Sequence, residues 1–70
     1  MYKNIEGNTT TFSGTEEELK KLRQVNPILM INAAETTDGF EFSVRTDHRG
    51  HTILTRALEK AAKEAGVEIN

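Results

Sequence analysis

The sequence has no cysteine, only two histidines and a single proline, so the usual covalent and metal supports of a small protein are missing. Without cysteine there is no disulfide and no thiolate cage for a metal ion. A chain of 70 residues also hides only about 60% of the surface that it exposes when unfolded. We therefore expect one domain over residues 1–70 that gains stability from unusually good packing or from self-association as a homodimer.

Long apolar runs are missing as well. No run approaches the roughly 18 residues that a membrane helix requires, and Met1–Asn8 contains no apolar core of a signal peptide. The composition is 36% hydrophobic and 29% charged, which is typical of a soluble globular domain. The net charge of −2 argues against a dedicated nucleic-acid binder, because such domains are usually basic. We expect a cytoplasmic protein that does not bind membranes.

Local signals predict a first helix between Thr15 and Pro27. Thr15 followed by Glu18 is the capping-box pattern of a helix start. Pro27 ends the helix because a proline forces the residue before it out of helical geometry. The apolar residues between these signals recur at helical spacing and form one narrow stripe: Leu19, Leu22 and Val25.

A hairpin is predicted next in the chain. Ile28–Ala34 and Phe40–Arg45 are its strands, and an Asp-Gly pair between them favours a tight turn. Side chains alternate between the two faces of a strand, which leaves Ile28 and Met30 on the outer face. The same alternation assigns one set of side chains to the core: Leu29, Ile31, Ala33, Phe40, Phe42 and Val44. A strand that stacks RNA bases would carry a basic and a small residue where Asp38 and Glu41 stand, so we expect both phenylalanines in the core.

The rest of the chain leaves two element orders open. Thr9–Ser13 is predicted as a short strand, and Thr52–Ala65 as a second helix that Gly66 ends. Tyr2–Asn8 is either a partner strand or a lead-in, and Val67–Ile69 is either a last strand or a tail. The fold class is α+β in both cases, a single small domain with an antiparallel sheet of three to four strands and two helices packed on one face. The order is ββαββα or the ferredoxin-like βαββαβ.

Both histidines lie in the connection Arg45–Thr52, before the second helix. Asp47, His48 and His51 are metal-ligand types, but a tight site needs three or four well-supported ligands, and no other histidine or cysteine exists. We therefore expect no metal and no cofactor. No nucleophile elbow, P-loop or paired-carboxylate motif is present, and we expect no enzyme activity. Asp47 or Thr52 should cap the helix that follows.

The same connection opens a basic region in an otherwise acidic protein. Between Arg45 and Lys63 there are five basic residues against two acidic ones, and the start of a helix attracts anions. Nucleic acid or another polyanion is therefore the alternative partner. The residues that would contact it are Arg45, His48, Arg49, His51, Arg56, Lys60 and Lys63.

Four apolar residues are not claimed by the predicted core: Tyr2, Ile28, Met30 and Ile53. In a small domain such residues often mark a surface that binds a partner or a second copy. The sequence therefore favours a small non-enzymatic protein-binding or regulatory module, of the adaptor or inhibitor type, that self-associates. We expect its partner to be another protein, a second copy of the chain, or both.

Overall fold

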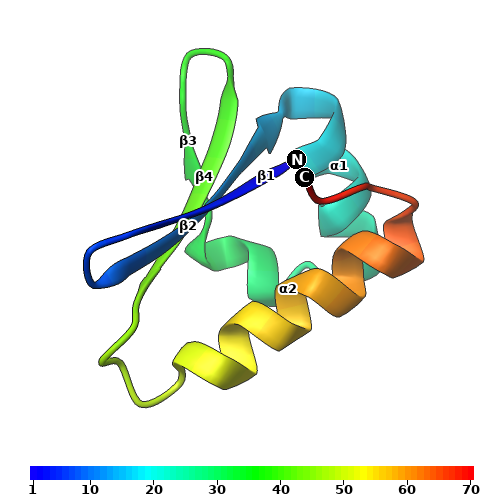
Figure 1. Ribbon diagram of the computed structural model, residues 1–70. Coiled ribbons are helices and arrows are strands. Elements are labelled where there is room, and N and C mark those ends of the chain that lie inside the picture. Colours follow the sequence, from blue (N-terminus) through cyan, green and yellow to red (C-terminus); the bar gives the residue numbers. More distant parts are fainter.

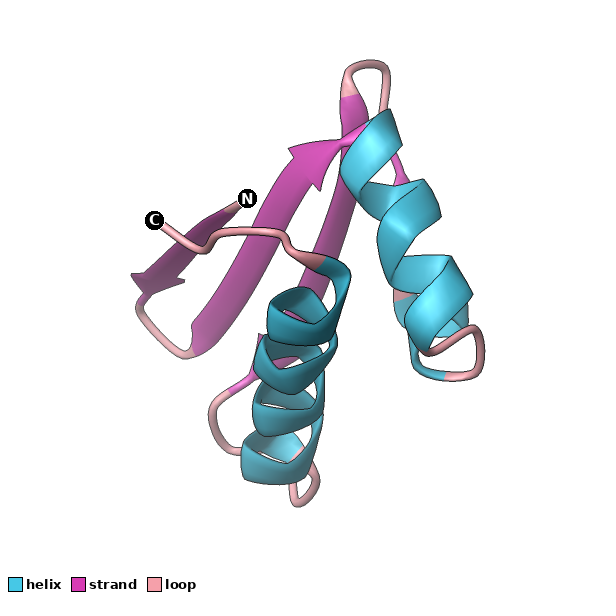
Figure 2. Cartoon of the chain, turned by 90° about the vertical axis from the view of Figure 1, so that its right-hand side faces the viewer, coloured by secondary structure: helices cyan, strands magenta, loops and turns pink.

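The computed structural model describes residues 1–70, which form a four-stranded antiparallel sheet with two helices packed on it (Figure 1). The order is ββαββα, with a short 3₁₀ helix, η1, before the third strand. The bounds are β1 Tyr2–Glu6, β2 Thr9–Thr15, α1 Glu16–Val25, η1 Leu29–Asn32, β3 Ala34–Glu35, β4 Gly39–Arg45 and α2 His51–Ala65. The strand order across the sheet is β1-β2-β4-β3, and both helices lie on one side of it (Figure 2).

This arrangement confirms the predicted α+β class and decides between the two predicted orders. The lead-in Tyr2–Glu6 is a strand that pairs with β2. The segment after Gly66 is not a strand, although Asn70 exchanges backbone hydrogen bonds with Met1 and Lys3 beside β1. The ferredoxin-like order is therefore wrong for this chain, and the two chain ends lie together (Figure 1).

One core fills the space between the sheet and the helices. Phe12 of β2 and Phe40 and Phe42 of β4 are at most 1% exposed, so the predicted core position of the last two is confirmed. The helices add Leu19, Leu22, Leu58, Ala61 and Ala62. The side chains that alternate with the buried ones on β2 and β4 lie on the opposite face of the sheet, which no helix covers and which is polar: Thr9, Thr11, Ser13, Glu41, Ser43 and Arg45.

The start of α1 is built as the sequence predicts. Thr15 Oγ1 accepts a hydrogen bond from the Glu18 N–H, and Glu18 Oε1 accepts one from the Thr15 N–H. Glu18 Oε2 also lies 2.8 Å from the buried amine of Met1. Burial by itself raises the pKa of Glu18, but hydrogen bonds from this amine and from Thr15, with the charge of the amine, hold the pKa below its ordinary value of 4.5. The carboxylate therefore fastens the beginning of β1 to α1.

The start of α2 has no side-chain cap. Its N-cap residue is Gly50, and the helix begins at His51. The two predicted caps are therefore wrong, because Asp47 binds Arg45 instead and Thr52 lies inside the first turn. At the other end Gly66 has a φ of 73° and stops the helix as predicted, since residues with a side chain are strained in that conformation.

The predicted strand over Ile28–Ala34 is wrong for most of its length. The chain forms η1 instead, and only Ala34–Glu35 pairs with β4. Two asparagine side chains close the turn: Asn26 accepts a hydrogen bond from the Leu29 N–H, and Asn32 donates one to the Leu29 carbonyl. These local bonds compete with strand pairing for the same backbone groups.

The 3₁₀ turn changes which apolar residues are buried. In a strand two neighbouring side chains point to opposite faces, whereas η1 places both Leu29 and Met30 in the core, at 7% and 1% exposure. Met30, predicted as part of an exposed partner surface, is therefore buried. Ile31, predicted for the core, is 79% exposed instead.

Candidate interaction surfaces

The connection between β4 and α2 is a network of short polar contacts. The Arg45 guanidinium donates two hydrogen bonds of 3.1 Å to the Asp47 carboxylate. The His48 N–H donates to the Arg45 carbonyl, and His48 Nδ1 accepts from the Gly50 N–H at 2.9 Å. Because Nδ1 is an acceptor, the hydrogen of the neutral imidazole lies on Nε2, which remains available as a donor.

The two histidines have different surroundings. His48 is exposed. His51 is half-buried, and its Nε2 lies 3.0 Å from the hydroxyl of buried Thr10, so this side chain belongs to the contact between α2 and β2. No group of three or more histidine, cysteine, aspartate or glutamate side chains is placed to hold a metal ion.

Four basic residues at the start and along the outer side of α2 are exposed and form no ion pair: Arg49, Arg56, Lys60 and Lys63. We call these four the basic surface. Glu59, the acidic residue among them, pairs with Lys3 of β1 at 3.5 Å. Arg45, which was predicted to join the basic residues, is paired with Asp47. The positive charge near α2 is therefore not neutralised by the helix itself.

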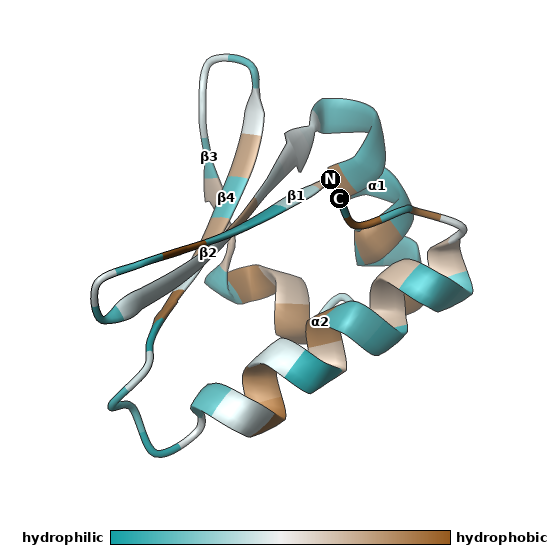
Figure 3. Cartoon of the chain, in the orientation of Figure 1, coloured by the Kyte–Doolittle hydropathy of each residue, from teal (hydrophilic) through white to brown (hydrophobic).

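Three isoleucines from neighbouring elements are exposed. Ile28 and Ile53 are 78% and 74% exposed, and Ile31 is the third. We call these three the isoleucine surface. η1 packs against both α1 and α2, and Figure 3 shows its apolar ribbon, in brown, next to α2. Ile53 lies one helical turn before Ala57, which faces the end of α1, so its side chain leaves α2 on the side of the α1 end that Ile28 and η1 follow in the chain.

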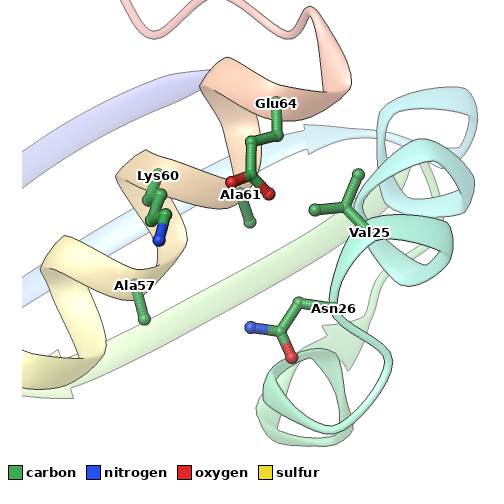
Figure 4. Close-up of a pocket in the computed structure, with 6 residues that line it drawn as sticks. All are labelled: Val25, Asn26, Ala57, Lys60, Ala61 and Glu64. Carbon is green, nitrogen blue, oxygen red and sulfur yellow. The ribbon is translucent and has the colours of Figure 1, made fainter.

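A groove of about 270 Å³ separates the end of α1 from α2 (Figure 4). Six residues line it, two from the end of α1 and four from α2: Val25, Asn26, Ala57, Lys60, Ala61 and Glu64. The small alanines leave this space between the helices open. Its volume lies near the lower limit of the roughly 300–1,000 Å³ of typical small-molecule sites, and the groove has room for one side chain of a partner.

A second groove, of about 310 Å³, lies beside the last residues of β4. We call it the β4 groove, and its lining residues are Asn32, Phe42, Ser43, Val44, Arg45, His48 and Leu54. It brings together two of the residues predicted to bind anions, Arg45 and His48, and places them next to apolar side chains. Sequence reasoning missed this groove because the strand predicted over Ile28–Ala34 would have covered it.

The predicted apolar residues do not form one surface. Tyr2 is exposed as expected, but it belongs to β1, whereas Ile28 and Ile53 come from the side of the sheet that carries the helices. Sequence reasoning missed two exposed residues, Ile31 and Ile5. Asn26 before η1 and Asn32 at its end were the sequence signal for a local turn that exposes Ile31.

No protein-family model matches the chain, and neither a curated protein nor a solved structure matches it. Neither helix combines the length and the apolar character that crossing a bilayer requires.

Proposed function

We propose that the protein is a non-enzymatic protein-binding module of regulatory type that acts through the isoleucine surface. The observation that carries this proposal is the exposure of three large aliphatic side chains, each at least 74% exposed, on elements that pack against one another. Burying one such side chain against a partner contributes roughly 1.5–3 kcal/mol. Groups of exposed aliphatic side chains are typical of binding surfaces, and the groove beside Ala57 offers room for a side chain of the partner.

Self-association and action in the cytoplasm are parts of this proposal. A second copy that covered the isoleucine surface would extend a core of only 13 buried residues. Sedimentation equilibrium over a range of concentrations tests this part. We expect a monomer–dimer equilibrium that Ile31→Asp shifts towards the monomer, whereas a wild-type chain that stays monomeric at all concentrations would contradict it.

Affinity capture from the source cell, with and without nuclease, tests binding to another protein. Each captured protein is then purified and its Kd is measured. Ile31→Asp should weaken binding by about tenfold or more, because an interface would bury the aspartate without a partner. Ile5→Asp is the matched control, since Ile5 is also exposed but lies on β1. A partner that binds wild type and Ile31→Asp equally well would contradict the proposal.

A polyanion is the second candidate partner, and the unpaired charges of the basic surface favour it. Binding through this surface should weaken steeply as salt rises, because each neutralised phosphate releases counterions. The double variant Arg56→Glu with Lys60→Glu should abolish binding to random-sequence RNA or DNA, whereas Ile31→Asp should leave it unchanged. Binding that does not respond to salt would rule out this candidate.

A further inference from the structure

One edge of β4 is covered along only half of its length. β2 pairs with all of Gly39–Arg45 on one side. On the other side β3 pairs only with Phe40 and Glu41. The remaining residues of β4 therefore have a neighbouring strand on one side alone.

The pairing register shows which backbone groups point to this open edge. Gly39 exchanges hydrogen bonds of 2.9 and 3.4 Å with Thr36, on the side of β3. Every second residue of a strand points its N–H and C=O to the same side, so Ser43 and Arg45 point theirs in the direction of β3 as well. The Arg45 carbonyl accepts a hydrogen bond from the His48 N–H. The N–H and C=O of Ser43 and the N–H of Arg45 are left without a backbone partner.

The edge is open because the chain leaves it at Ala33. A regular strand over Ile28–Ala34 would have continued alongside β4, but η1 turns away and buries Leu29 and Met30 instead. Exposed strand edges are usually blocked in proteins, because they are templates for pairing with another chain. Here the β4 groove lies against the unpaired stretch, since Ser43, Val44 and Arg45 are among its lining residues.

We propose that the β4 groove receives an extended, acidic segment of a partner protein, which adds a strand to the sheet alongside Phe42–Arg45. Backbone groups of the segment would bond to those of Ser43 and Arg45, as in other complexes formed by strand addition. Its alternate side chains would enter the groove and contact Val44 and Leu54. This inference rests on the proposed protein-binding function but places the partner on a surface other than the isoleucines.

Free hydrogen-bond donors in the groove and the unpaired Arg49 beside it favour an acidic segment. Arg45 uses Nε and Nη2 for Asp47, so its Nη1 group remains as a donor. His48 Nε2 is a second donor in the groove lining, and the unpaired Arg49 follows it in the chain. A second copy of this chain is a poor occupant, because symmetric pairing of two β4 edges would bring the same cationic groups of both copies together.

Selection from a library of short random peptides displayed on phage tests the proposal. We expect the recovered peptides to alternate apolar and acidic residues and to bind as strands. Ser43→Pro removes the edge N–H but leaves the pairing of Phe42 and Val44 with β2, so it should weaken binding by about tenfold or more. Ser43→Ala is the matched control, because it keeps the N–H, and it should bind like wild type.

Amide hydrogen exchange of wild type, with and without a recovered peptide, tests strand addition at β4 even if Ser43→Pro fails to fold. The peptide should slow exchange at Ser43 and Arg45 and leave Glu41 unchanged. An empty selection, peptides of helical or basic pattern, unchanged exchange at Ser43, or a dimer that protects Ser43 without peptide would each overturn the proposal. Ile31→Asp should not affect these peptides, so the edge site can fail while the isoleucine surface still binds its partner, and the reverse also holds.

Discussion

The two ends of β4 differ in how many of their polar groups have partners. At the α1 end, Gly39–Glu41, β3 covers the edge, and the start of α1 next to it has a complete capping box. At the α2 end, Phe42–Arg45, one edge is open and α2 begins without a side-chain cap. Beyond that end the cations of the basic surface have no acidic partners. One strand thus connects a closed end with an end whose groups remain available for binding.

This difference indicates that the two ends serve different purposes. Polar groups that bind one another contribute to stability and leave little for a partner, whereas unpaired backbone groups and charges remain available to one. We therefore expect substitutions at the α1 end to change mainly stability. At the α2 end, exposed substitutions should change mainly binding.

The largest difference in stability is expected between substitutions of two neighbouring residues of η1, the segment that leaves the edge open. Met30→Ala removes a buried side chain and should lower the free energy of unfolding by about 3 kcal/mol. Ile31→Ala should change it by less than about 0.5 kcal/mol, because Ile31 is exposed. Urea unfolding measures both. If Ile31→Ala lowered the free energy of unfolding more than Met30→Ala, the segment would be a strand that closes the β4 groove.

A smaller difference in stability is expected between glycine substitutions near the two ends of β4. A Cβ on Gly39 would collide with the backbone of Gly14 and Thr15, so Gly39→Ala should lower the free energy of unfolding by about 2 kcal/mol. A Cβ on Gly50 would lie 3.3 Å from the His48 imidazole and 3.7 Å from Leu54 Cδ1, which are side chains that can move. We expect a loss below about 1 kcal/mol there. Thermal unfolding of the two variants gives the comparison, and equal losses would remove the contrast between the ends.

Acid should lower the free energy of unfolding through Glu18, which lies at the α1 end. The folded state lowers the pKa of Glu18 below 4.5, so the stability that its charge contributes is present above that pH and is lost as the pH falls through the folded-state pKa. Glu18→Gln should therefore cost about 1–2 kcal/mol at neutral pH. The difference from wild type should shrink in acid. Urea unfolding over a pH series checks this, and a difference independent of pH would contradict the role of the ion pair with Met1.

The smallest effect on stability is expected from the unpaired cations. Arg49→Gln should change the free energy of unfolding by less than about 0.5 kcal/mol, because Arg49 is exposed and has no ion pair to lose. The same variant should weaken the binding of an acidic peptide in the β4 groove. If Arg49→Gln clearly lowered stability without any change in peptide binding, Arg49 would have a structural role instead of a binding role.

Structural features that depend on a few adjacent residues were predicted correctly from the sequence. The capping box of Thr15 and Glu18, the stop at Gly66 and the buried Phe40 and Phe42 all depend on local chemistry or on simple alternation. The α+β class and the two helices follow from such signals. The exposure of Arg56 and Lys60 was likewise predictable from helical spacing.

The region around η1 was not predictable in the same way. Alternation in Ile28–Ala34 fits a strand, but the hydrogen bonds of the Asn26 and Asn32 side chains, and the burial of Leu29 and Met30 together, favour a 3₁₀ turn. Tertiary packing overrides local preference in such short apolar segments. The open edge of β4 and the exposed Ile31 both follow from that one turn, so the alternation of side chains along the segment could not predict either of them.

Amide hydrogen exchange of the unbound protein tests the difference between the two ends of β4 most directly. The N–H groups of Glu41 and Ser43 point to the same side of the strand, but only Glu41 has a partner in β3. We expect Glu41 to exchange slowly and Ser43 to exchange fast, close to the rate of an exposed loop. Equal protection of the two amides would show that the edge is covered and would contradict an open binding site beside β4.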